Sequence, residues 1–370
     1  MHLPKYTARV SIVLASLVVI SSVIYQRYSQ WEHQRNIQNS ADKTEDFNPV
    51  LDSKSDGSWE SSPLCRGFYK VICQGKEIVT DPTGIVQPDV RGEVEALRLY
   101  EMILHEHPSW TNEQVDEELV KRIYTPKRKR MLEEIFQWIQ VRMIRLIRKQ
   151  SSSIFSAEAK KLLVSRIENI RLEIPPPAQL YANEPDLFTK NDVYYESISA
   201  ERRIIRVGGA YLLSAKSWFN RVFTIAHEMS HSIDPCELVN EKFSAVGYQN
   251  LLNCFQELNL LKAEQVKDRC VKNHFLGELF ADWLATQIAV QALEVYSSRF
   301  KTLDEISNSV INSVKDLCHQ ESWLTQEVES HPPPKDRIEK IFGSHPGLQS
   351  LLSCPGEHKT IRYCTFEGKK

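Results

Sequence analysis

The sequence predicts a mainly α protein of the α+β class that carries a small antiparallel sheet edge. Apolar residues recur at helical spacing over much of residues 91–172, and again over 216–233 and about 275–297. Between these segments, residues 193–195 and 204–207 are short aromatic and β-branched runs of the kind found in strands. Of the 370 residues, 42% are hydrophobic and 25% are charged, which is the composition of a globular chain rather than a disordered one.

The first element is an apolar run at residues 10–25, which follows Lys5 and Arg9. It is slightly shorter than the ~20 residues that span a bilayer comfortably. No small-residue cleavage site follows it, so we expect an uncleaved signal anchor, with a cleaved signal peptide or a buried core helix as the alternatives. The positive-inside rule places residues 1–9 in the cytoplasm and the rest of the chain in the extracellular or periplasmic space. We therefore expect a single-pass, membrane-anchored protein.

All eight cysteines lie after this apolar run. An even number of cysteines in an oxidising compartment indicates disulfides, with buried free thiols as the alternative. No two of them form a CxxC motif, so a cysteine-rich zinc site or a thioredoxin-type centre is not expected. Spacing alone does not choose among the possible pairings.

The next two regions differ in polarity. Residues 26–64 are polar and are expected to form an extended linker, because they have little to bury. Residues 65–190 are expected to form a helical region, which the prolines at 175–177 interrupt. Its basic segment, 127–148, is interpreted as a solvated helix face, with contact to an anionic lipid or an acidic partner as the alternative. An apolar stripe in this region consists of Leu132, Ile135, Phe136, Ile139, Met143 and Leu146.

The most specific motif lies in the predicted 216–233 helix, where the sequence reads HEMSH from His227 to His231. Positions four apart share one face of a helix, so both imidazoles can reach one metal ion. Glu228 lies beside the first histidine and can act as a general base on a water at the metal. The motif therefore predicts one bound zinc ion.

A second motif, ELFAD, lies on the following predicted helix. Its Glu278 can supply the third protein ligand that zinc requires. Asp282 lies one turn later and can accept a hydrogen bond from a ligand imidazole, which would fix its tautomer. His274 is a rival ligand on the same face, and a solvated acidic pair is the alternative without function.

The two motifs together resemble the neprilysin and endothelin-converting-enzyme family of zinc metallopeptidases. Residues 192–195 (DVYY) resemble the strand with which that family binds substrate backbone. Residues 330–337 (SHPPPKDR) and the final segment, 342–364, resemble its C-terminal stretches. The resemblance covers residues 191–370 and implies that they form a thermolysin-like zincin catalytic domain, with 65–190 as a reduced helical region.

The resemblance gives the residues of HEMSH and ELFAD the roles already described. It also implies that His331 hydrogen-bonds the oxyanion of the tetrahedral intermediate, and that Arg337 contacts substrate carbonyl groups. Asp192, Val193 and Tyr194 would bind the substrate backbone. Asp192 stands where the family has Asn, and Val193 where it has Ala. Ionised Asp only accepts hydrogen bonds whereas Asn also donates, which indicates an altered substrate preference.

The resemblance also implies three disulfides and leaves the last two cysteines to pair by elimination. The implied pairs are Cys65 with Cys354, Cys73 with Cys318, and Cys254 with Cys364, and the remaining pair is Cys236 with Cys270.

These expectations define a zinc metalloendopeptidase that acts on a peptide or protein substrate outside the cytoplasm. The net charge of −2 gives no general attraction to nucleic acid. Two alternatives are a zinc-loaded peptide-binding protein without turnover, and a membrane-tethered structural module whose zinc stabilises the fold. The intact Glu228 argues against the first. A metal position with three protein ligands and an open fourth position would argue against the second.

Overall fold

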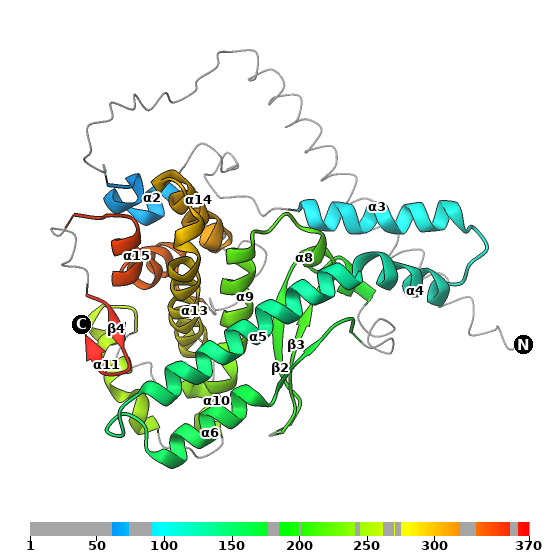
Figure 1. The fold of residues 1–370 in the computed structure, drawn as a ribbon. Helices are drawn as coiled ribbons and strands as arrows, with labels where there is room; N and C mark the ends of the chain where they lie inside the picture. The colour runs from blue at the N-terminus through cyan, green and yellow to red at the C-terminus, as the bar shows by residue number, and fades with distance from the viewer. Residues whose placement is uncertain are drawn as a thin grey trace, which may run out of the picture. The chain divides into compact units, whose positions relative to one another are not determined.

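The computed structural model describes a mainly helical protein with a small mixed sheet (Figure 1). All described residues belong to one compact unit, Trp59–Lys370. The predicted signal anchor at 10–25 and the rival ligand His274 lie outside the described residues, and the predicted division of the chain at residue 190 stays a prediction. None of the helices in the described ranges is long and apolar enough to cross a membrane. The described ranges are 61–73, 90–176, 185–199, 201–240, 245–261, 270, 275–318, 331–355 and 362–369.

The N-terminal half of the unit is built from helices whose ends follow local sequence signals. Thr111 forms a capping box with Gln114 at the start of α4, and Thr125 caps α5 just before a proline at its first position. Ser156 caps α6 in the same way. The elements are η1 (Pro63–Arg66), α2 (Phe68–Cys73), α3 (Arg91–Glu106), α4 (Asn112–Ile123), α5 (Pro126–Lys149) and α6 (Ala157–Glu168).

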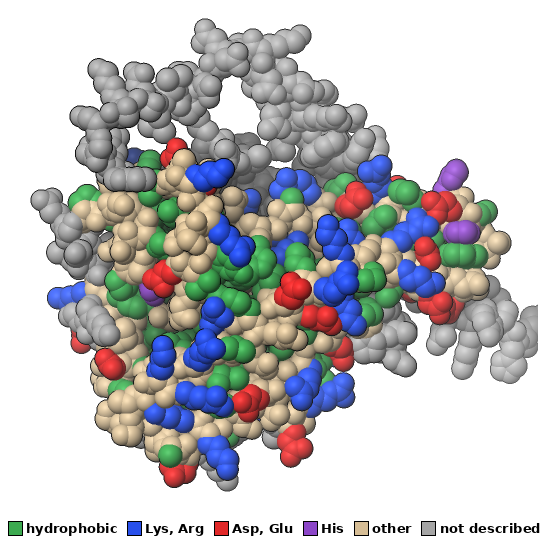
Figure 2. Space-filling model, in the orientation of Figure 1, with side chains coloured by type: hydrophobic (Ala, Val, Ile, Leu, Met, Phe, Trp, Pro, Cys, Tyr) green, Lys and Arg blue, Asp and Glu red, His purple; other side chains and the backbone are tan. Residues whose placement is uncertain are grey.

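The long helix α5 is amphipathic. Its buried residues are spaced three or four apart, as a single core-facing stripe requires, but the stripe ends at Ile147, and the expected Leu146 is only partly buried. Figure 2 shows Lys and Arg side chains along α5 and α6 on the face toward the viewer. This agrees with the interpretation of the basic segment as a solvated helix face. The exposed basic residues of α5 are Lys127, Arg130, Arg145, Arg148 and Lys149.

The sheet has three strands in the order β1-β3-β2. Both predicted strands are present, and β2 (Val193–Ser197) pairs antiparallel with β3 (Arg203–Val207). The expected antiparallel edge is therefore present, but the sheet as a whole is mixed, because β1 (Ile170–Glu173) pairs parallel with β3. Parallel pairing joins segments that are distant in sequence, so no local turn signal predicts it. β3 is buried throughout, and β2 forms an edge of the described sheet.

Two helices form the centre of the C-terminal half and pack against each other, as Figure 1 shows. They are α9 (Trp218–Ser230) and α13 (Phe275–Tyr296). α13 is apolar around most of its circumference, which is typical of a helix surrounded by protein. The other elements are η2 (Pro185–Phe188), α8 (Gly209–Leu213), η3 (His231–Ile233), α10 (Pro235–Asn240), η4 (Ala245–Tyr248), α11 (Gln249–Glu257), η6 (Ser297–Arg299), α14 (Leu303–Val314), η7 (Lys315–Cys318), the π-helix η9 (Asp336–Phe342), α15 (Pro346–Leu351), β4 (Cys364–Thr365) and β5 (Gly368–Lys369).

Four disulfides join distant parts of the unit, and every cysteine of the chain is in one of them. They are the three pairs that the family resemblance implied and the fourth pair that was left by elimination. Two of them tie η1 and α2 to segments roughly 250–290 residues later, and a third ties α11 to β4. Closing such long loops restricts the unfolded chain, by roughly 5 kcal/mol each in the chain-entropy description. The four pairs are Cys65–Cys354, Cys73–Cys318, Cys254–Cys364 and Cys236–Cys270.

Candidate metal centre

The HEMSH motif occupies the last turn of α9 and the start of η3. Ser217 caps the helix by accepting a hydrogen bond from the Asn220 N–H at 3.0 Å, so α9 begins one residue after it. His227 and His231 lie one turn apart on the face that packs against α13. His227 is buried and His231 is nearly so, with 16% of its side chain exposed. The sequence motif therefore brings both imidazoles to the junction between the two central helices.

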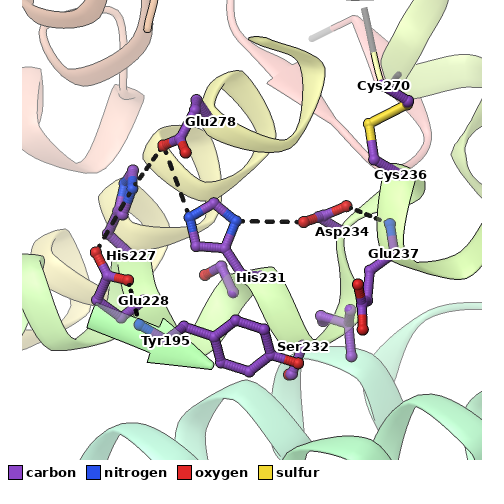
Figure 3. A network of polar contacts seen from close by, with 12 residues as sticks. Tyr195, His227, Glu228, His231, Ser232, Asp234, Cys236, Glu237, Cys270 and Glu278 are labelled. Carbon is purple, nitrogen blue, oxygen red and sulfur yellow. Dashed lines mark hydrogen bonds and ion pairs between the residues drawn. A yellow bond between two sulfur atoms is a disulfide. The ribbon is translucent and has the colours of Figure 1, made fainter. Parts of the chain in front are cut away.

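Glu278, in the first turn of α13, meets both imidazoles. Its Oε2 lies 3.0 Å from His227 Nε2 and 3.6 Å from His231 Nε2 (Figure 3). His331 approaches the same oxygen, with its Nε2 at 2.9 Å. Burial raises the pKa of Glu278, but hydrogen bonds from His227 and His331 outweigh that effect and bring its pKa well below the usual range. Glu278 is therefore ionised and is the point at which the three histidines converge.

Each histidine of the motif is oriented from behind by a second carboxylate. His227 Nδ1 lies 3.0 Å from Asp282 Oδ1, and His231 Nδ1 lies 3.2 Å from Asp234 Oδ2. An ionised carboxylate only accepts hydrogen bonds, so Asp282 and Asp234 each hold a proton on Nδ1, and it is Nε2 of both imidazoles that faces Glu278. Burial lowers the pKa of both imidazoles, but the hydrogen bonds to Asp282 and Asp234 raise each pKa above its ordinary value. The site therefore has a negative potential that favours a cation.

The donor set fits a zinc ion. Two neutral imidazole nitrogens and one carboxylate oxygen are a common ligand set for zinc in enzymes. With bonds of about 2.0–2.1 Å, neighbouring ligands of a tetrahedral zinc lie about 3.3–3.4 Å apart. The distances of 3.0 and 3.6 Å from Glu278 Oε2 to the two Nε2 atoms lie on either side of that value.

Two overlapping groups of ligand atoms surround this position. Atoms of His227, Glu228 and His231 lie within 4.8 Å of one another, and so do atoms of His227, Glu278 and His331. Glu228 has a competing commitment, because its Oε2 accepts a hydrogen bond from the Tyr195 N–H at 2.9 Å. Its other oxygen is 4.0 Å from His227 Nε2. Glu278 is therefore the better third ligand, and Glu228 is better placed as a base.

Glu228 lies beside His227 and contacts strand β2 through the Tyr195 N–H, as Figure 3 shows. Burial raises the pKa of Glu228 to about 7, against the opposing effects of His227 and His231. A carboxylate with a pKa near neutrality is suited to accept and return a proton under physiological conditions.

The predicted substrate strand presents its outer edge to this carboxylate. The Asp192 carbonyl accepts a hydrogen bond from the Gly208 N–H. The main-chain groups of even-numbered residues in β2 therefore face β3, and those of odd-numbered residues face away from it. The Tyr195 N–H consequently points the other way, toward Glu228. Val193 is buried, whereas Asp192 is exposed and its Oδ1 accepts from Val193 N–H at 2.8 Å. Tyr194 is partly buried, with the Lys190 ammonium 5.0 Å from its ring centroid.

Arg337 has a different position from the one that its predicted role suggests. Its Nε and Nη2 donate to the two oxygens of Asp282 at 2.6 and 2.8 Å. Burial raises the pKa of Asp282, but the Arg337 guanidinium and His227 outweigh that effect and bring its pKa well below the usual range. Arg337 thus holds the carboxylate that orients His227. Contact between Arg337 and substrate carbonyl groups stays a prediction, as does the role of His331 at the oxyanion.

Two groups at the site were missed in the sequence. Asp234 orients His231, and its signal was an acidic residue three positions after the second histidine of HEMSH. The N–H of Tyr195 had no such signal, since every residue except proline carries a main-chain donor.

Comparisons with known proteins leave the function to be argued from this site. No protein-family model and no curated protein matches the chain. The fold is similar to the crystal structure of PEPO from Lactobacillus rhamnosis HN001 (DR20), with a TM-score of 0.41 and 13% sequence identity. The match covers 66% of this chain and 48% of that one, so the matched part of this chain spans about half the length of the other protein. A likeness at this level carries no argument about chemistry.

Proposed function

We propose that the protein is a zinc-dependent metalloendopeptidase of the neprilysin-like type. The observation that carries this proposal is the convergence of His227 Nε2 and His231 Nε2 on Glu278, with Glu228 beside them at the edge of a strand. His227, His231 and Glu278 would hold one zinc ion. Bound there, zinc would polarise the scissile carbonyl group and lower the pKa of a water molecule.

Glu228 performs the proton transfers. Its carboxylate accepts a proton from the attacking water and delivers it to the leaving amine, which completes hydrolysis of the peptide bond. The main-chain N–H of Tyr195 holds the Glu228 carboxylate in place at 2.9 Å. The family resemblance assigns the oxyanion to His331, whose Nε2 lies 2.9 Å from Glu278 Oε2 and is therefore close to the metal position.

The substrate is bound as an extended chain along β2. An edge strand presents main-chain groups that a peptide pairs with by adding a strand to the sheet. Val193 turns its main-chain carbonyl to this edge, whereas the main-chain groups of Asp192 and Tyr194 face β3, so these two residues would contact substrate through their side chains. The Glu228 carboxylate lies on the same side of the strand as the Tyr195 N–H. This mode reads backbone more than side chains, so it suits peptides and unfolded protein segments.

We place this activity outside the cytoplasm, with the chain anchored through residues 10–25. Four disulfides support an oxidising compartment, because such bonds are rare in reducing ones.

Peptide turnover tests the proposal. Purified protein is incubated with a mixed peptide library before and after treatment with a chelator, and after zinc is restored. We expect cleavage to be lost when the metal is removed and regained when zinc is restored. In Glu228→Gln we expect turnover to fall by roughly 10³-fold, which is the size of effect that removing a general base has. Glu101→Gln, on the exposed face of α3, is the matched control and should cleave normally.

The outcomes separate the alternatives. A protein that binds zinc and peptides but does not cleave them would be a binding protein. A protein that loses its fold without zinc and has no peptide affinity would be a structural module. Full turnover in Glu228→Gln would overturn the proposed mechanism.

A further inference from the structure

The Cys236–Cys270 disulfide differs from the other three in its position. Cys236 lies five residues after His231, and Cys270 lies eight residues before Glu278. The bond therefore joins the two chain segments that carry the candidate zinc ligands. Figure 3 shows it beside Asp234 and Glu237, on the side of the site behind His231.

Asp234 connects this disulfide to the metal position. Its Oδ2 lies 3.2 Å from His231 Nδ1, while its Oδ1 accepts from the Glu237 N–H at 2.8 Å. Its main-chain oxygen accepts from the Leu238 N–H at 3.2 Å. Asp234 is thus held by the first turn of α10, the short helix that contains Cys236. A displacement of α10 would move the carboxylate that orients His231.

The first turn of α13 packs directly on the same carboxylate. A Cβ atom added at Gly277 would lie 3.2 Å from Asp234 Oδ2 and 3.5 Å from its Cγ. Asp234 is 5% exposed and fills the space between His231 and the helix that begins at Phe275. Cys270 precedes that helix by only five residues in the sequence, so the disulfide links α10 covalently to the chain just before α13.

We propose that Cys236 and Cys270 are positioning residues for the metal centre: their disulfide holds Asp234, and through it His231, in register with Glu278. This inference rests on the proposed zinc site. It assigns the bond a local role, whereas the Cys254–Cys364 disulfide joins α11 to β4. Among the described residues, no hydrogen bond or ion pair joins that second disulfide to the candidate zinc ligands, so it serves as a matched control.

Zinc affinity separates a positioning role from a merely structural one. The dissociation constant is measured by competition with a chelator in Cys236→Ser/Cys270→Ser and in Cys254→Ser/Cys364→Ser. Serine replaces the thiols because reduced cysteines would themselves bind zinc. We expect 10–100-fold weaker binding in the first variant, as for other groups that orient a metal ligand, and less than about threefold in the second, although both melt at lower temperature. Equal zinc affinity in the two variants would overturn the proposal.

A further variant tests the route through Asp234. If the disulfide acts by holding this carboxylate, the disulfide should no longer matter once the carboxylate is gone. We therefore expect Cys236→Ser/Cys270→Ser/Asp234→Asn to bind zinc as tightly as Asp234→Asn alone. Losses that multiply would show that the disulfide acts by another route, and would contradict the inference. Should the cysteine variant not fold, Gly277→Ala keeps the disulfide and presses on Asp234. We expect it to weaken zinc binding severalfold, and an unchanged affinity would count against the proposal.

A measurement without metal keeps this inference separate from the proposed function. Amide hydrogen exchange at Glu237 and Leu238 reports on the two hydrogen bonds to Asp234. In chelator-treated protein we expect exchange to be at least tenfold faster in Cys236→Ser/Cys270→Ser than in Cys254→Ser/Cys364→Ser. If the natural protein does not bind zinc, the proposed function fails, and this comparison still decides whether the disulfide holds Asp234. Equal exchange rates in the two variants would refute the proposal that the Cys236–Cys270 disulfide holds Asp234.

Discussion

At the residue scale, the side chains proposed to bind zinc or transfer protons are held in position by neighbouring groups that have no such role themselves. Arg337 binds Asp282, Asp282 orients His227, and the Tyr195 N–H holds Glu228. Fixed partners of this kind reduce the reorganisation that a reaction demands, because the polar groups are already in place. The arrangement also explains why a buried Asp282 is tolerated, since its charge is paired on both sides.

The sequence predicted the residues of HEMSH and ELFAD because helical spacing determines which side chains share a face. It did not predict the contact between Arg337 and Asp282. These residues lie 55 positions apart on different elements, and only the packing of η9 beside α13 brings them together. Local patterns were therefore enough to predict the side chains of the candidate site, whereas the contacts that support them could be seen only in the folded structure.

Asp192 leads to a prediction about substrate preference. It is exposed and directly precedes β2. Burial has the largest effect on the pKa of Glu228 and raises it, and the two histidines lower it. The charge of Asp192 has a smaller effect, which also raises this pKa. A negative charge here favours substrates with a free amine or a basic side chain near the scissile bond. We expect kcat/KM to favour free-amine over blocked peptides, and this ratio to fall severalfold in Asp192→Asn. The same ratio in both proteins would refute the role of Asp192.

His345 leads to a prediction about pH. Burial lowers its pKa to about 4, and its Nδ1 accepts the Gly347 N–H at 3.1 Å at the start of α15. Because the unfolded chain has the ordinary pKa of about 6.5, it binds more protons than the folded protein between pH 6.5 and 4. The stability is therefore complete above pH 6.5 and falls as the pH drops through this window, by up to roughly 3 kcal/mol for this group alone.

The control for this effect is His345→Asn, which keeps an acceptor for the helix end but does not titrate. We expect its free energy of unfolding, measured in urea, to fall less than that of the natural protein between pH 7 and pH 4.5. Parallel curves for the two proteins would show that His345 does not carry the effect.

At the element scale, α13 is the structural centre of the candidate site, because it positions both Glu278 and Asp282. Ile288 is completely buried ten residues beyond Glu278, whereas Val295 on the same helix is 54% exposed. We expect Ile288→Ala to lower the free energy of unfolding by about 2–5 kcal/mol through loss of packing. Val295→Ala should change it by less than about 0.5 kcal/mol. Chemical denaturation of the two variants tests this, and similar losses would contradict the central placement of α13.

The helices and the strands β2 and β3 were predictable because their patterns are local. α9 and α13 have apolar residues in runs long enough to exclude strands, and β2 and β3 are bounded by polar turns. β1 was not predicted, because only Asn169 separates its four residues from α6 and its parallel partner is about 30 positions away. A strand this short has too little periodicity to be separated from the preceding helix.

At the scale of the whole molecule, the disulfides connect the two ends of the described unit. Spacing did not determine their pairing; it followed from the family resemblance and from elimination. The Cys65–Cys354 bond closes a loop of 289 residues and joins η1 to the segment after α15. We expect Cys65→Ser/Cys354→Ser to lower the free energy of unfolding by about 2–5 kcal/mol. Zinc affinity of the folded protein should stay the same, and a large loss of affinity would show that this bond also supports the metal centre.

We proposed that His227, His231 and Glu278 hold one zinc ion beside Glu228. Anomalous diffraction at the zinc edge, from crystals of the zinc-loaded protein, would locate that ion. We expect a single peak bonded to Nε2 of His227, Nε2 of His231 and an oxygen of Glu278, at about 2.0–2.2 Å from each. A peak bonded to Glu228 in place of Glu278, or no peak between α9 and α13, would contradict the proposal.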